Sequence, residues 1–151
     1  GHPSLLLSGT IIGINYLKRV CSPTNIRIVL EIGGGYGTLG EILLGDKRNA
    51  CCYIDVDIPP VSYFATYYLQ KLFGKEIADY SEYRDKSEIR IKKIEESFKG
   101  AVLCSWQLPR LVGEIDLFVN YHSFAEMEPD VVENYCRIIC NLKPNYVIYV
   151  I

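Results

Sequence analysis

The sequence is poor in the residues that most often build metal sites. It contains two histidines, and one of them, His2, follows Gly1 in a start that resembles a remnant of cloning. Its six cysteines form no Cys-x-x-Cys pair. A structural zinc site needs about four closely spaced cysteine or histidine ligands, so the sequence predicts no metal site.

Long apolar runs and basic blocks are also missing. No apolar run approaches the ~20 residues of a membrane-spanning helix, and no basic segment followed by an apolar stretch marks the start as a secretion signal. The 16 Lys and Arg residues are outnumbered by 18 Asp and Glu residues, and no basic run is longer than a pair. We therefore expect neither a membrane nor a nucleic-acid partner.

The cysteines occupy positions typical of free thiols. Cys51, Cys52 and Cys104 fall inside predicted strands, and Cys136 and Cys140 lie four residues apart on one face of a predicted helix. Buried free cysteine behaves as a small hydrophobic residue. The sequence thus predicts buried thiols without disulfides, and a protein of the reducing cytoplasm.

The 151 residues do contain alternating strand and helix patterns, which are typical of a single α/β domain. Apolar, β-branched runs predict strands, and stretches with apolar residues on one face predict helices. The predicted strands cover residues 26–32, 50–56, 101–105, 115–120 and 146–151. The predicted helices cover residues 8–20, 38–44, 61–73 and 129–142. This order predicts a Rossmann-like, mostly parallel sheet flanked by helices.

Two segments carry more specific expectations. Residues 75–99 are dense in mixed charge and are predicted to form a solvated helix and loop. In the helix over residues 129–142, the spacing predicts five inward-facing side chains. These are Val131, Val132, Tyr135, Ile138 and Ile139.

A glycine-rich turn follows the first predicted strand. Gly33, Gly35 and Gly37 alternate there, because a sharp turn from strand to helix needs positive φ angles and because a ligand reaches the backbone only where no Cβ intervenes. In open α/β sheets, ligands bind beyond the carboxyl ends of the strands. The turn therefore indicates a nucleotide-type cofactor.

Two frames of this turn compete. Gly35-x-Gly37-x-x-Gly40 matches the dinucleotide fingerprint, and Asp57 lies near the expected ribose-binding position. In this frame, however, the first glycine comes three residues after Ile32, the last apolar residue of the strand. The other frame, Glu31-x-Gly33-x-Gly35-x-Gly37, starts at the strand's end and carries an acid at its head.

This second frame resembles the first motif of class I S-adenosylmethionine-dependent methyltransferases. The resemblance implies that Gly33, Gly35 and Gly37 lie against the methionine part of S-adenosylmethionine and that Glu31 helps position its amino group.

In that family a second acid, at the end of strand two, binds both ribose hydroxyls. Asp57 is the preferred candidate and Asp55 the secondary one, and the two share a face of the strand. A carboxylate suits this task because it accepts two hydrogen bonds at once. Residues 53–61 also resemble the same segment of a narrower group, the bacterial sugar O-methyltransferases.

Two later segments fit the same resemblance. Trp106 follows strand three, where the family holds the adenine, and its ring could stack on the base. After strand four, the chain is similar to the Asn-x-x-Ser-Phe-x-Glu-Met segment of the sugar O-methyltransferases, which lines the gap between methyl donor and acceptor. The matching residues are Asn120, Ser123, Phe124, Glu126 and Met127.

Within this segment His122 and Glu126 are the candidate catalytic bases, and Asn120 is a candidate cofactor-binding residue. His122 falls at a position that varies in the family pattern, but an imidazole near neutral pKa can take a proton from a hydroxyl. Glu126 could do the same or bind sugar hydroxyls.

The resemblance implies an S-adenosylmethionine-dependent O-methyltransferase acting on a small hydroxylated acceptor such as a sugar. The alternatives are an NAD(P)-binding Rossmann oxidoreductase domain and a non-catalytic cofactor-binding module. The family carries two more strands after the fifth, whereas this sequence ends at Ile151. We therefore expect residues 1–151 to be a single domain that is incomplete at its C-terminus, with self-association through the last strand.

Overall fold

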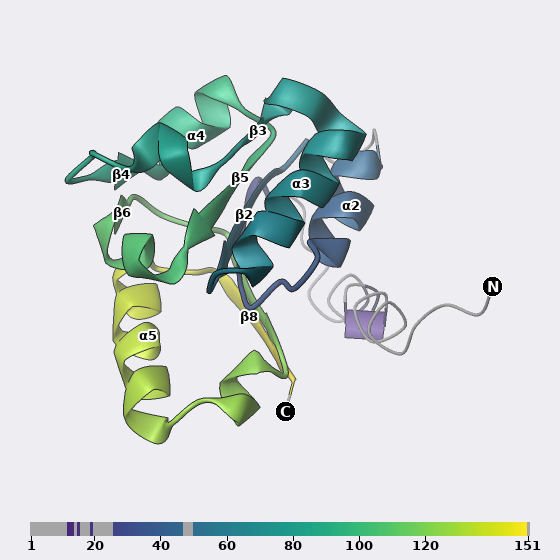
Figure 1. Cartoon of the computed structure of the whole chain (residues 1–151). Coiled ribbons are helices and arrows are strands. Elements are labelled where there is room, and N and C mark those ends of the chain that lie inside the picture. Colours follow the sequence, from purple (N-terminus) through teal and green to yellow (C-terminus); the bar gives the residue numbers. More distant parts are fainter. Residues whose placement is uncertain (1–11, 14, 16–18, 20–25, 47–49, 151) are drawn as a thin grey trace.

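The structure is a computed structural model that describes residues 12, 13, 15, 19, 26–46 and 50–150 (Figure 1). The predicted helix over residues 8–20 lies mostly outside the described residues. The four of its residues that are described, Ile12, Gly13, Asn15 and Arg19, are helical.

The fold is built on one parallel sheet. Its strands are β1 (Ile28–Ile32), β2 (Cys52–Asp57), β3 (Ile77–Ala78), β5 (Gly100–Cys104), β7 (Leu117–Tyr121) and β8 (Tyr146–Val150). They lie in the order β3-β5-β2-β1-β7-β8, and every pairing is parallel. The strand order reverses at β1, which has β2 on one side and β7 on the other.

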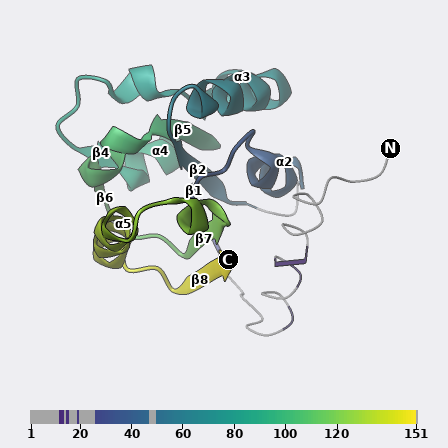
Figure 2. The ribbon, with the colours of Figure 1, turned by 60° about the horizontal axis from the view of Figure 1, so that its bottom comes forward.

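Helices cover both faces of this sheet (Figures 1 and 2). Side chains of α2 (Thr38–Gly45) and α3 (Val61–Phe73) pack against one face. Those of α4 (Ile91–Ser97) and α5 (Pro129–Asn141) pack against the other. The predicted fold class, a Rossmann-like parallel sheet flanked by helices, is therefore confirmed.

Short elements complete the chain. A second, two-stranded parallel sheet pairs β4 (Ile89–Arg90) with β6 (Leu111–Val112). Short 3₁₀ segments are η1 (Gly74–Glu76), η2 (Tyr80–Tyr83), η3 (Ser105–Arg110) and η4 (Ser123–Glu126).

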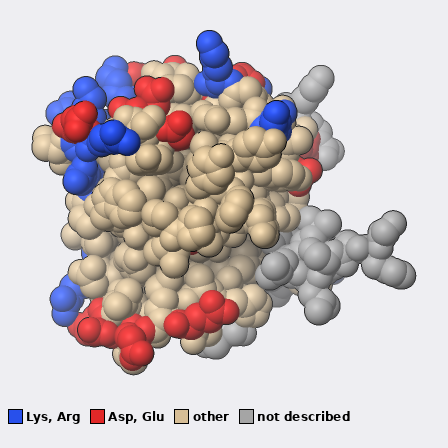
Figure 3. Space-filling model, viewed as in Figure 1, with Lys and Arg blue, Asp and Glu red and all other residues tan. Residues whose placement is uncertain are grey.

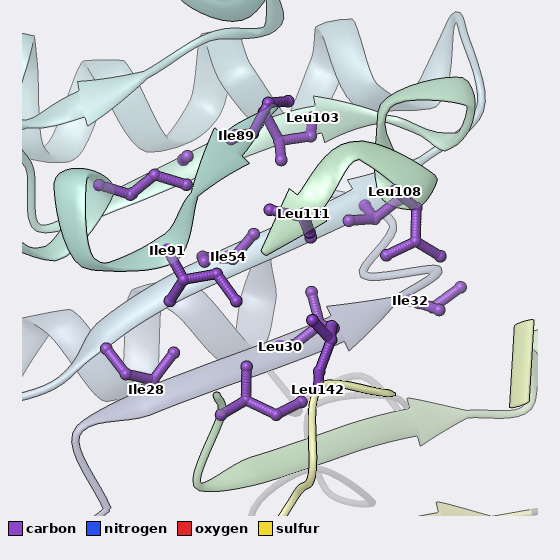
Figure 4. Packing of buried hydrophobic residues seen from close by; sticks show 14 of the residues in the cluster. Ile28, Leu30, Ile32, Ile54, Ile89, Ile91, Leu103, Leu108, Leu111 and Leu142 are labelled. Atoms are coloured by element: carbon purple, nitrogen blue, oxygen red, sulfur yellow. The ribbon is translucent and has the colours of Figure 1, made fainter. Parts of the chain in front are cut away.

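The core lies on both faces because the central strands carry apolar side chains on both sides. All five residues of β1 are buried, as are all five of β5. This is what a parallel strand covered twice requires. Figure 4 shows one of the two clusters, in which Leu30, Ile54 and Leu103 come from three neighbouring strands.

The charged segment over residues 75–99 is more deeply integrated than predicted. It contributes β3 to the edge of the main sheet and buries Ile77, Ile89, Ile91 and Ile94. The interpretation as a solvated helix and loop was wrong for these residues, because isolated isoleucines among many charges give no visible period.

Two predictions of burial on α5 were also wrong. Val131 is 39% exposed, although Ile139 is buried and Val132, Tyr135 and Ile138 pack against the core as expected. Cys136 and Cys140 are exposed, because their face of the helix points away from the sheet. By contrast, Cys52 and Cys104 are buried and Cys51 is half-buried, and all five of these thiols are free.

None of the helices in the described part of the chain combines the length and the apolar character needed to cross a membrane.

Candidate functional site

A cleft opens at the carboxyl ends of the central strands. Its volume is about 330 Å³, within the range of ligand pockets. Its walls come from the turn after β1, the end of β2, η3, η4 and α5. The lining residues are Ile32, Gly33, Val56, Asp57, Ile58, Val61, Ser105, Ser123, Glu126, Met127 and Tyr135.

The glycine turn forms one wall of this cleft with the predicted backbone geometry. Gly33, Gly35 and Gly37 have φ angles of 77°, 61° and 81°, which side chains strongly disfavour. A Cβ at Gly33 would lie 2.3 Å from Ser123 Oγ, whereas a Cβ at Gly35 would meet nothing within 4 Å. The turn therefore leaves open space above Gly35 and packs tightly at Gly33.

Asp57 faces the cleft from the end of β2. Its Oδ2 accepts a hydrogen bond from the Gly35 N–H at 3.1 Å, and its Oδ1 accepts one from the Ile58 N–H at 2.7 Å. Burial raises the pKa of Asp57, although these two backbone bonds partly oppose the shift. Asp57 thus ties the glycine turn to β2 while its carboxylate remains at the cleft.

Asp55 lies elsewhere, beneath the turn. It is fully buried, and its Oδ1 accepts a hydrogen bond from the Gly34 N–H at 3.2 Å. Its Oδ2 is buried without a hydrogen-bond partner. Of the two candidate ribose-binding acids, only Asp57 lines the cleft.

Glu31 is also buried, at 3% exposure, and does not line the cleft. Its Oε2 accepts a hydrogen bond from the Tyr53 hydroxyl at 2.5 Å. Burial raises the pKa of Glu31 from 4.5 to about 7, with the bond from Tyr53 opposing the shift and the charge of Asp57 adding to it.

Gly34 is a residue of the site that the motif did not single out. A Cβ there would lie 2.4 Å from Asp55 Oδ1 and 2.8 Å from the Tyr53 hydroxyl oxygen. The glycine is therefore required by the acidic cluster beneath it rather than by its backbone angles. A motif read along the turn alone carries no sign of this contact.

Asn120 anchors the loop after β7 to the end of β1. Its Nδ2 donates to the Ile32 carbonyl at 3.0 Å and to Ser123 Oγ at 2.6 Å, and its Oδ1 accepts from the Phe124 N–H at 3.2 Å. These contacts assign Asn120 a positioning role, and its direct contact with a cofactor stays a prediction.

The two candidate bases are placed differently. Glu126 is exposed and lines the cleft, beside Met127. His122 is exposed but is not a lining residue, and its backbone, at a φ of 67°, donates its N–H to the Val150 carbonyl at 2.9 Å.

Trp106 lies at the rim of the cleft. It lies in η3 and is 53% exposed, while the preceding Ser105 lines the cleft. The following Gln107 is fully buried and fixes this segment, because its Oε1 accepts from the Cys104 N–H and its Nε2 donates to the Tyr80 carbonyl, both at 3.0 Å.

Tyr135 of α5 closes the far side of the cleft, and sequence reasoning had assigned it only to the core. Its ring stacks on Phe124 with 6.0 Å between centroids and 10° between planes. The helical period places Tyr135 on the inner face, but only the tertiary structure brings that face over the ends of the strands.

The electrostatic character of the cleft is acidic. Asp57 and Glu126 line it, and no lysine or arginine is among its lining residues. Glu31 and Asp55 lie behind the glycine turn. Among the described residues no three His, Cys, Asp or Glu side chains are grouped so that they could hold a metal ion. The cleft therefore favours an organic ligand with positive charge.

No model of a known family and no curated protein sequence matches this chain. Among solved structures, the chain is similar to the mitomycin 7-O-methyltransferase MmcR, with a TM-score of 0.48 and 15% sequence identity. The similarity covers 85% of this chain and 32% of that one, so this chain spans about a third of that protein's length. At this identity the similarity carries no information about the ligand.

Proposed function

We propose that this chain is an S-adenosylmethionine-dependent methyltransferase domain that methylates an oxygen of a small hydroxylated acceptor such as a sugar. What supports the proposal is an acidic cleft beside a positive-φ glycine turn, with no basic residue among its lining residues.

Charge separates this cofactor from a dinucleotide. S-adenosylmethionine carries a sulfonium and an ammonium cation, which carboxylates stabilise. The pyrophosphate of NAD is anionic and would lie in a cleft lined by Asp57 and Glu126. Like charges at close range in a partly buried site repel strongly, so the acids disfavour the dinucleotide frame of the turn.

The residues fit the proposed cofactor. Each oxygen of Asp57 accepts one backbone bond, and a carboxylate offers about four lone-pair sites, so two sites remain for the two ribose hydroxyls. The open space at Gly35 allows a ligand to touch the backbone. Glu31 would act on the methionine amino group from behind the turn, and Ser105 and Trp106 would contact the adenine.

The protein's share of the chemistry is mostly positioning. When bound, the cofactor supplies an already activated methyl group. The chain's residues hold the reactants in line, which can supply much of the rate enhancement. Glu126, at the cleft, is the base that would accept the proton of the acceptor hydroxyl, and His122 is the second candidate.

Calorimetry with S-adenosylhomocysteine and with NAD tests the cofactor. We expect S-adenosylhomocysteine to bind and NAD to give no heat. Asp57→Ala should abolish binding, whereas Asp130→Ala, at an exposed aspartate of α5, should leave it unchanged. Binding of NAD alone, or equal binding by the Asp57 variant, would overturn the proposal.

Transfer of labelled methyl to a panel of sugars tests the chemistry. Glu126→Gln should lower kcat by about 10²- to 10⁴-fold, the usual share of a general base, with little change in cofactor affinity. His122→Gln should have a smaller effect. Cofactor binding without methyl transfer to any acceptor would instead indicate a non-catalytic binding module.

A further inference from the structure

Two buried carboxyl groups lie side by side behind the glycine turn. Glu31 of β1 and Asp55 of β2 are opposite each other in the parallel register, at 3% and 0% exposure. The hydroxyl of Tyr53 donates to Glu31, and the N–H of Gly34 donates to Asp55. We call Glu31 and Asp55 the carboxyl pair.

No described cation accompanies this pair. Among the described residues, the titratable groups that face it are Tyr53 and Asp57 on β2 and Tyr121 on β7. The helices over this face, α2 and α3, bury only apolar or small side chains against the sheet. None of the ion pairs between described residues includes Glu31, Asp55 or Asp57.

Two adjacent carboxyl groups in such a site do not both ionise. Removing a carboxylate from water is strongly unfavourable unless a cation or several donors compensate it, and a second negative charge nearby makes it more so. The Oδ2 of Asp55 is buried without a hydrogen-bond donor, so the Gly34 N–H on its Oδ1 only partly compensates a charge on this carboxyl.

We propose that Glu31 and Asp55 share a single proton in the free protein and release it to solvent when the cationic part of the cofactor binds over the glycine turn. Asp55 is then a positioning residue that makes cofactor affinity depend on pH. The inference rests on the proposed function, since it needs a ligand that carries positive charge.

The direction of the pH dependence follows from the proton balance. Binding that releases a proton becomes tighter as pH rises, by up to about tenfold per pH unit while the pair is protonated in the free protein and ionised in the complex. An α-amino group has an ordinary pKa of about 7.7–8.0, so the ligand stays cationic below about pH 7.5.

Calorimetry in buffers with different ionisation enthalpies counts the protons. With S-adenosylmethionine or S-adenosylhomocysteine as the probe, we expect release of a substantial fraction of one proton, up to about one, per ligand near pH 6.5. Asp55→Asn and Glu31→Gln keep the side-chain shape but cannot share the proton. Each should reduce the release and flatten the pH dependence of Kd, because the remaining carboxyl loses its like-charged neighbour, whereas Asp130→Asn should change neither.

The outcomes separate the two proposals. If the heat of binding does not depend on the buffer, or if both pair variants release as many protons as the wild type, the shared proton is overturned and the proposed function still stands. No heat from either probe would overturn the proposed function and this inference with it. Carboxyl ¹³C chemical shifts of the free protein provide a second readout, in which the pair should titrate with one step near neutral pH.

Discussion

At the scale of single residues, the glycine turn depends on two different physical demands. Gly33, Gly35 and Gly37 are needed for their positive φ angles, but Gly34 is needed for space, since Asp55 and Tyr53 lie where its Cβ would be. The sequence motif captures the first demand and not the second.

Gly34→Ala should therefore destabilise the fold by about 1–3 kcal/mol, the usual cost of overpacking, and weaken cofactor binding. Gly45→Ala is the matched control, because it also lacks a positive φ and a Cβ there meets nothing within 4 Å. Urea unfolding measures both variants. Equal stability of the two would contradict the crowding at Gly34.

A second prediction at this scale concerns pH. Burial raises the pKa of Glu31 to about 7, so the folded state holds a proton that the unfolded chain releases near pH 4.5. The stability from this proton is fully present below about pH 4.5 and is lost as pH rises through about 7, a change on the order of 3 kcal/mol.

Urea unfolding at about pH 5 and about pH 8 measures this loss. Glu31→Gln cannot ionise and should lose less stability than the wild type over the same interval. If the wild type is as stable at the higher pH as at the lower one, and the variant shows the same result, Glu31 does not cause the pH dependence of stability.

At the scale of elements, the predictable part of the fold is the part with long, unmixed patterns. The strands over residues 26–32 and 50–56 and the helix over residues 61–73, which Gly74 follows, matched β1, β2 and α3 within about two residues at each end. Runs of β-branched residues and a glycine stop act locally, so the sequence alone reveals them.

The same reasoning missed elements whose stability comes from neighbours far along the chain. The strand β3 has two residues and exists because it pairs with β5. The cleft is assembled likewise, since Tyr135 reaches it only through the packing of α5. By contrast, Asp57 could be placed from the end of β2 and Glu126 from the segment that follows β7. The direct roles assigned to Trp106, Asn120 and His122 remain predictions.

Ile94 tests the integration of the charged segment. Its side chain is fully buried in α4, so Ile94→Ala should cost about 2–5 kcal/mol of unfolding free energy. Val131→Ala, at a residue of α5 that is 39% exposed, should cost well under half as much. Similar losses for both would mean that α4 is the solvated element that its charges suggest.

At the scale of the whole molecule, two surfaces could bring copies together. Strand β8 lies at the edge of the sheet and pairs only with β7 among the described strands. Its residues Val147 and Tyr149 are 57% and 47% exposed. The face shown in Figure 3 is largely free of charge in its middle, where α3 exposes Tyr63, Phe64 and Tyr67.

Our prediction is that self-association occurs through β8, because the outer edge of an edge strand presents backbone donors and acceptors to another chain. Val147→Lys should shift the protein toward the monomer in sedimentation velocity. Tyr67→Lys, at a side chain that is 56% exposed, should leave the distribution unchanged. A wild-type monomer at high concentration, or dissociation by the Tyr67 variant alone, would contradict the prediction.

The exposed thiols of α5 allow a fluorescent dye to be attached to the protein. Among the described cysteines, Cys136 and Cys140 are exposed, while Cys52 and Cys104 are buried and burial raises their pKa. A maleimide dye will therefore label α5 selectively over these buried positions. With Cys140 replaced by serine, a dye on Cys136 would follow α5, the helix that carries Tyr135 of the cleft wall, and its fluorescence would report any movement of this helix when the cleft is filled.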